Sequence, residues 1–308
     1  MIISASYKTD IPTFYGEWFM NRLRSGHCKM LNPYSRRSIR VSLMREDVDG
    51  IVFWTKNVSP FLKFLPEIRE RGIPFMVQHT INGYPRALEH SVVDAASSVR
   101  SVRKIADDFG PEVCIWRYDT IVMSSSTPES FHLQQFSRLA ESLRGAVNEV
   151  VISFMQLYAK TVRNLNAAGK EFSFTWHDPS ADEKRNLGKK LVEIAGSFGL
   201  RLSICAQREL LVDGAFDARC VDAERLGRIA GEHISTKLRG NRKECGCFAS
   251  RDIGEYDTCP HGCVYCYAVR NQELALARYR KHNPNSEFLF EPEFPVAGEE
   301  ESPQLSLI

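Results

Sequence analysis

Residues 50–80 of the chain have the sequence GIVFWTKNVSPFLKFLPEIRERGIPFMVQHT. Two short apolar runs, Gly50 to Trp54 and Pro74 to Thr80, flank an amphipathic segment from Pro60 to Arg71, and Gly72 follows that segment. Apolar runs of this length predict buried parallel strands. The segment between them predicts a helix that ends on a glycine in the left-handed conformation. The stretch therefore predicts one strand–helix–strand unit of an α/β protein.

The same alternation recurs along the chain. It predicts further strands and helices at Ile2 to Ser6, Ser91 to Phe109, Glu112 to Trp116, Pro128 to Leu143, Glu149 to Phe154, Asp182 to Phe198 and Leu200 to Cys205. Repeated right-handed units build either an open doubly wound sheet or a (β/α) barrel. Polar residues follow several of these strands, and a barrel brings all such ends to one mouth. We therefore expect an α/β fold with a partial (β/α) barrel of about six parallel strands.

The pattern divides the chain into three regions. Residues 1–210 are expected to form the barrel core, with a β-hairpin insertion near residues 27–41. Residues 211–282 are expected to form a cysteine-rich region that binds a cluster and completes the barrel. Residues 283–308 are rich in Pro, Glu and Ser, a composition typical of a flexible tail.

The composition is that of an ordinary globular protein. The 308 residues include 40 Lys and Arg against 38 Asp and Glu, and the net charge of +2 does not require a polyanionic partner. Met1 to Asp10 has no long apolar stretch, and no segment approaches membrane-spanning length, so we expect a cytoplasmic protein without a membrane partner. The cytoplasm keeps thiols reduced, which makes metal binding the leading explanation for any of the nine cysteines that cluster.

Three cysteines lie together in the sequence Cys259-Pro-His-Gly-Cys263-Val-Tyr-Cys266, and a helical pattern follows. Thiolates favour iron–sulfur clusters, zinc or cuprous copper, and three ligands leave a fourth coordination position open. Zinc sites usually combine two separated short pairs of ligands, so this spacing favours an iron–sulfur cluster. A zinc site and buried unligated thiols remain the alternatives.

The spacing Cys-x-x-x-Cys-x-aromatic-Cys resembles the signature of the radical S-adenosylmethionine (radical SAM) superfamily, with Tyr265 at the aromatic position. The longer string Cys-Pro-His-Gly-Cys-Val-Tyr-Cys-Tyr-Ala is similar to the spore photoproduct lyase, or DNA repair photolyase-like, branch. The resemblance implies a 4Fe-4S cluster on Cys259, Cys263 and Cys266, with S-adenosylmethionine chelating the fourth iron. It also implies an external one-electron donor, of the flavodoxin or ferredoxin type, and a 5′-deoxyadenosyl radical that abstracts hydrogen from a substrate.

In that superfamily the cluster loop follows the first barrel strand, whereas here it lies near the C-terminal end. The resemblance therefore implies a circularly permuted barrel. Ser6-Tyr-Lys-Thr-Asp10, Trp54-Thr-Lys56 and Thr80 also resemble segments of the same branch. The whole chain resembles an uncharacterised family with such a cysteine cluster at its C-terminal end, and that family assigns no substrate.

Four more cysteines, Cys205, Cys220, Cys245 and Cys247, are enough for a second metal site. Four thiolates suit an auxiliary iron–sulfur cluster or a structural zinc ion. The alternative is that Cys205 is a core residue and Cys220 a surface thiol.

Strand-end residues are the candidates for binding the cofactor or the substrate. Lys56 is either a solvated lysine or a cation that faces a carboxylate or phosphate. Arg117 and Asp119 either brace a loop as a mutual ion pair or bind the substrate, or the ribose and carboxylate of S-adenosylmethionine. Together with Tyr265 they form the predicted cofactor-binding set, and no catalytic residue is assigned.

Two basic clusters, Arg36 to Arg45 and Lys237 to Lys243, are typical of solvated faces. The resembled branch includes DNA repair enzymes, so nucleic acid or a nucleotide is a candidate substrate. The rival hypothesis is a non-enzymatic zinc-bound module that binds nucleic acid and uses Cys245, Cys247 and the three cysteines of the motif.

Overall fold

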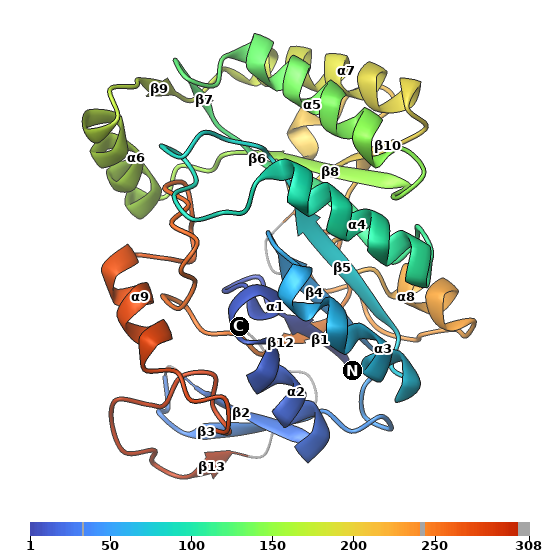
Figure 1. Ribbon diagram of the computed structural model, residues 1–308, viewed down its shortest axis with the longest axis vertical. Coiled ribbons are helices and arrows are strands. Elements are labelled where there is room, and N and C mark those ends of the chain that lie inside the picture. Colours follow the sequence, from blue (N-terminus) through green and yellow to red (C-terminus); the bar gives the residue numbers. More distant parts are fainter. Residues whose placement is uncertain (33, 241–243, 301–308) are drawn as a thin grey trace.

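The computed structural model describes residues 1–32, 34–240 and 244–300, and its centre is a parallel sheet of eight strands (Figure 1). The order across the sheet is β11-β10-β8-β6-β5-β4-β1-β12. These strands are β1 (Ile2–Ala5), β4 (Gly50–Thr55), β5 (Phe75–Thr80), β6 (Cys114–Ile121), β8 (Glu149–Phe154), β10 (Arg201–Ile204), β11 (Phe216–Asp217) and β12 (Ser250–Asp252).

Helices connect most of these strands in the alternation that the sequence predicts. They are α1 (Ile11–Phe14), α2 (Gly16–Ser25), α3 (Leu65–Glu70), α4 (Ala95–Phe109), α5 (Glu129–Leu143), α6 (Ala159–Glu171), α7 (Ala181–Ser197), α8 (Ala223–Ala230) and α9 (Gln272–Arg280), with 3-10 turns at Ser59–Phe64 and Arg208–Leu210. Helix α7 begins with a capping box, in which Ser180 and Glu183 each satisfy the backbone N–H of the other.

Side chains alternate along each strand, so every strand contributes residues to both faces of the sheet, and both faces are covered. On one face, Phe53, Val77 and Trp116 pack in a core with α2, α3, α4, α5 and α7. On the other face, Val52 and Met76 pack against α8 and the segment around Cys220. Trp54, Gln78, Arg117, Ser153 and Cys205 share this second face by the same alternation. These polar and thiol side chains therefore share one face of the sheet, whereas Thr55 and His79 lie on the other.

The predicted hairpin is confirmed as β2 (His27–Leu31) and β3 (Ser38–Ser42), which pair antiparallel. Residues 283–300, for which the sequence predicts a flexible tail, lie along this hairpin and α2. Trp18 Nε1 donates to the Ser286 carbonyl at 3.0 Å, and β13 (Glu299–Glu300) pairs with β3. Residues 301–308 of the predicted tail lie outside the described residues. A small two-stranded ribbon, β7 (Met123–Ser124) with β9 (Trp176–His177), completes the elements.

All six predicted strands occur, but the sheet has eight strands rather than about six. The sequence pattern misses β11 and β12, which have two and three residues and no apolar run. In the described part of the chain the sheet is not closed, and β11 and β12 are its two edge strands.

None of the helices formed by residues 1–32, 34–240 and 244–300 is both long and apolar enough to cross a membrane.

Candidate metal centre

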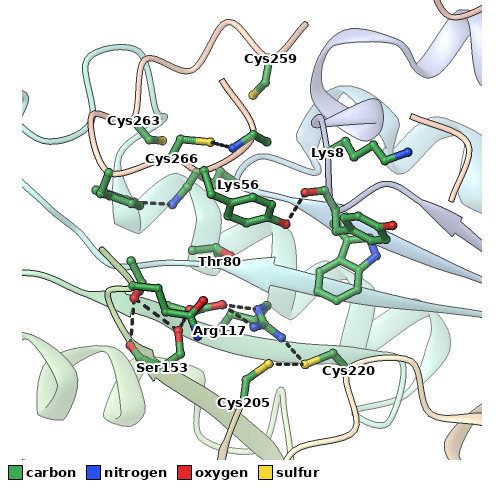
Figure 2. Close-up of a pocket in the computed structure, with 18 of the residues that line it drawn as sticks. Lys8, Lys56, Thr80, Arg117, Ser153, Cys205, Cys220, Cys259, Cys263 and Cys266 are labelled. Atoms are coloured by element: carbon green, nitrogen blue, oxygen red, sulfur yellow. Dashed lines mark hydrogen bonds and ion pairs between the residues drawn. The ribbon is translucent and has the colours of Figure 1, made fainter. Parts of the chain in front are cut away.

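A cavity of about 580 Å³ lies at the carboxyl ends of the parallel strands. Both predicted cysteine sets line it. Figure 2 shows Cys259, Cys263 and Cys266 on one side and Cys205 and Cys220 on the other, with Lys56, Thr80 and Arg117 between them. Cys245 and Cys247 also line the cavity. The fold therefore brings together seven thiols from segments that are up to about 60 residues apart in the sequence.

The cysteine loop is anchored to the start of the chain. His261 Nε2 lies 2.7 Å from Asp10 Oδ2, and that carboxylate also accepts the backbone N–H groups of Thr13 and Lys56. Burial raises the pKa of Asp10, but the hydrogen bonds from His261, Lys56 and Thr13 outweigh it and hold the pKa below its usual value. Tyr15 adds a second anchor by donating its hydroxyl to the Thr258 carbonyl at 2.5 Å.

A second segment, residues 85–92, holds the other side of the loop through its backbone. The N–H of Val264 donates to the Leu88 carbonyl, and the N–H of Ser91 donates to the His261 carbonyl. Gly262 has a φ of +71°, and a Cβ there would lie 2.9 Å from His90 Cβ. Only glycine fits this position without strain, so the glycine of the motif has a structural role.

Lys56 and Tyr265, both predicted as cofactor-binding residues, meet at a buried carboxylate. Lys56 Nζ lies 2.8 Å from Glu89 Oε1 and 3.0 Å from the Tyr265 hydroxyl, which itself donates to Glu89. Burial lowers the pKa of Lys56, but the charge of Glu89 and its neighbours raises it above the usual range. Lys56 is therefore a cation that faces a carboxylate, and this carboxylate belongs to the protein itself.

Arg117 and Asp119 form the mutual ion pair that the sequence offered as one alternative. Arg117 Nε donates to Asp119 Oδ2 at 3.0 Å, and the Ser153 hydroxyl donates to the other carboxylate oxygen. The Arg117 side chain also reaches the opposite group of thiols, because its Nη1 lies 2.9 Å from Cys220 Sγ. Arg117 thus lies between the two groups of thiols that line the cavity, as Figure 2 shows.

The other four cysteines at the cavity contact one another in a chain. Cys205 Sγ lies 3.3 Å from Cys220 Sγ, Cys220 contacts Cys247, and Cys247 contacts Cys245. Cys28 and Cys114, which are isolated from the other cysteines in the sequence, are fully buried in the apolar core on the other face of the sheet.

Burial raises the pKa of Cys259, Cys263 and Cys266, although the charge of Lys56 opposes this at Cys263. Across the described residues, no three thiol, imidazole or carboxylate groups surround a single point as the ligands of one ion. The donor set nevertheless fits a cluster with an open corner, since one loop directs three soft sulfur donors into one cavity.

The structure also reveals functional candidates that the sequence does not indicate. Glu89 lies in a loop and does not directly follow a predicted strand, and the residues around it match no motif that would mark a functional side chain. Asp252 ends β12, accepts the hydroxyls of Ser4 and Ser6 at 2.7 Å each, and so joins β12 to the first strand of the chain. His261 stands inside the cysteine motif, and this position is the only signal that points to it.

Taken together, the molecule is a parallel α/β protein with a cysteine-lined cavity at the carboxyl ends of its strands. The chain belongs to the family described as Domain of unknown function (DUF1848), which it matches over residues 2–268. Neither the curated proteins nor the solved structures contain a significant match to it.

Proposed function

We propose that the protein is a radical SAM enzyme that binds a 4Fe-4S cluster on Cys259, Cys263 and Cys266. The observation that carries the proposal is that a single loop directs all three thiols into one large cavity. With S-adenosylmethionine bound at its open corner, such a cluster supplies one electron that generates a 5′-deoxyadenosyl radical for hydrogen abstraction. The protein is then cytoplasmic and takes its electron from a flavodoxin-like or ferredoxin-like partner.

The position of β12 supports a permuted partial barrel. This strand pairs parallel with β1 at the edge of the sheet, and the cysteine loop follows it at the carboxyl ends of the strands. In space, β12 is therefore the first strand of a series that continues through β1, β4, β5, β6 and β8. The cysteine loop follows this spatially first strand, as in the resembled superfamily, although the strand comes late in the sequence.

The residues around the cavity have clear tasks under this proposal. Lys56 and the Arg117–Asp119 pair provide fixed charges for the polar groups of S-adenosylmethionine, and hydrogen bonds hold these side chains in place before any ligand binds. Tyr265 is held by Glu89, and burial keeps its pKa well above the usual value, so it stays a hydrogen-bond donor. Aromatic side chains at the cavity, among them Trp54, exclude water from a reactive site.

The part of the cavity around Tyr256 suits an anionic substrate. Lys8 Nζ and Lys160 Nζ lie 5.4 Å and 5.7 Å from the ring centroid of Tyr256, and all three side chains line the cavity. Two cations beside an aromatic ring suit a phosphate next to a stacked base. A nucleotide or nucleic acid is therefore the substrate class that we propose.

The test is anaerobic reconstitution with iron and sulfide, followed by reduction in the presence of S-adenosylmethionine. We expect a brown protein that forms 5′-deoxyadenosine, and the variant Cys263→Ala should lose this product. Cys28→Ala is the matched control because it removes a buried thiol on the other face of the sheet. If reconstituted protein with an intact cluster forms no 5′-deoxyadenosine, the catalytic proposal is wrong.

Metal content tests the rival of a zinc-bound nucleic-acid module. Two of the rival's five cysteines, Cys245 and Cys247, belong to the chain of four thiols described above, and Cys247 contacts Cys220 in the structure. Zinc without iron in protein purified anaerobically, together with salt-sensitive binding of DNA, would favour the rival.

A further inference from the structure

Cys205, Cys220, Cys245 and Cys247 come from three separate parts of the chain. Cys205 directly follows β10, Cys220 lies between β11 and α8, and Cys245 and Cys247 precede β12. Their sulfur atoms nevertheless meet, with 3.3 Å between Cys205 and Cys220 and contacts from Cys220 through Cys247 to Cys245. The fold thus assembles four soft donors from distant segments, in a chain of contacts that, in the described residues, does not yet surround one point.

The backbone around these thiols is closely fitted. The N–H of Val221 donates to Cys247 Sγ at 3.3 Å, and the Gln78 amide donates to the Cys220 carbonyl at 2.8 Å. Gly240 lies against Cys245, because a Cβ on it would be only 2.2 Å from the Cys245 carbonyl oxygen. Hydrogen bonds to sulfur and to the backbone of a ligand are the contacts that orient thiolates at metal sites.

A buried cation is directed at the same sulfur atoms. The Arg117 side chain is 5% exposed, and its Nη1 lies 2.9 Å from Cys220 Sγ. A guanidinium in this position stabilises a thiolate over a neutral thiol and offsets part of the negative charge that four thiolates carry. Asp119 is the carboxylate partner of this cation, and the contact with Cys220 adds to that ion pair.

A pair of disulfides is a poorer explanation of the group. The Cys205–Cys220 sulfur separation of 3.3 Å exceeds the disulfide bond length of about 2 Å. Cys220 contacts both Cys205 and Cys247, so the four thiols form one continuous chain and not two isolated pairs.

We propose that Cys205, Cys220, Cys245 and Cys247 hold a second metal centre with four thiolate ligands, on the wall of the cavity opposite the first three cysteines. Four protein ligands leave no open coordination position, so this centre cannot bind S-adenosylmethionine as the first does. The chemistry fits a 4Fe-4S cluster or a zinc ion, and both require the same four sulfur donors. The inference does not depend on the proposed radical chemistry, because it uses none of the cysteines of the first loop.

The experiment therefore begins by removing the first loop's thiols. Protein with Cys259→Ala, Cys263→Ala and Cys266→Ala is purified and reconstituted anaerobically, and its iron, sulfide and zinc are measured. We expect about four iron and four sulfide per chain for a cluster, or about one zinc. Adding Cys245→Ala and Cys247→Ala should remove this metal, whereas adding Cys28→Ala should leave it.

Native thiol alkylation with mass spectrometry keeps the test decisive even if the fivefold variant does not fold. In the triple variant, the four cysteines should be protected from alkylation while metal is bound and should react once it is removed by chelation or oxidation. The proposal is wrong if the triple variant holds no stoichiometric metal, or if Cys205 and Cys220 are joined by a disulfide in the anaerobic protein. Either result would leave the proposal for the first cluster untouched, because wild-type iron content and 5′-deoxyadenosine formation test that separately.

Discussion

Replacing Lys56 with methionine would leave Glu89 as a buried charge without its cation. The Lys56 and Glu89 side chains are 15% and 4% exposed, and their charged atoms are 2.8 Å apart. At an effective dielectric constant of about 20, attraction at this distance is about 6 kcal/mol, and the cost of burying both charges offsets much of it. Tyr265 and Asn82 still donate to Glu89 in the variant. We expect Lys56→Met to lower the free energy of unfolding by about 3–5 kcal/mol.

The double variant Lys56→Met/Glu89→Gln should lose much less than the sum of the two single variants, because it removes both charges. Urea unfolding of the reduced protein, followed by tryptophan fluorescence, measures all three losses. Lys104→Met is the matched control, since Lys104 pairs with Asp108 at 3.0 Å on the surface and its side chain is 60% exposed. That control should change stability by at most about 0.5 kcal/mol. Additive losses, or a Lys56→Met loss no larger than the control, would refute the reasoning.

Two further predictions concern the loop and the pH dependence of stability. Gly262→Ala should lower the free energy of unfolding by about 1–2 kcal/mol because residue 262 has a left-handed backbone, and it should weaken iron retention by displacing the loop from His90. Gly196→Ala is the control, since Gly196 lies in open space within α7 and its replacement should be neutral or slightly stabilising. Equal iron retention in the two variants would contradict the role of Gly262. Burial lowers the pKa of His132 to about 4 in the folded protein, whereas in the unfolded chain a histidine titrates near about 6.5. As the pH falls below about 6.5, the unfolded chain binds a proton that the folded protein does not, so the free energy of unfolding decreases until about pH 4. The stability advantage of wild type over His132→Gln, measured by urea unfolding, should therefore shrink by about 2 kcal/mol from pH 7 to pH 5, and a pH-independent difference would show that His132 does not titrate in this way.

The sequence predicts the elements whose signal is local. Each of the six predicted strands has an apolar run long enough to be buried on both faces, and all six occur. Strand β12 has no such signal, because its residues Ser250, Arg251 and Asp252 are polar. It forms because its backbone pairs with β1, and because Asp252 accepts two hydroxyl groups from the far end of the chain. A strand that depends on such a distant partner cannot be recognised from the periodicity of its own residues.

The same distinction applies to the site. The spacing of Cys259, Cys263 and Cys266 is a local property, and the structure places all three at the cavity as the motif suggests. What holds them there is not local, since Asp10 lies 251 residues from His261. The sequence left Lys56 as either a solvated lysine or a cation that faces an anion, and it could not identify Glu89, the carboxylate that Lys56 faces from a loop. The identity of a strand-end cation can thus be predicted from sequence, whereas its partner is determined by which loops the sheet order brings together. For this reason the substrate has to be sought among the residues that face the cysteine loop across the cavity, and not in the motif.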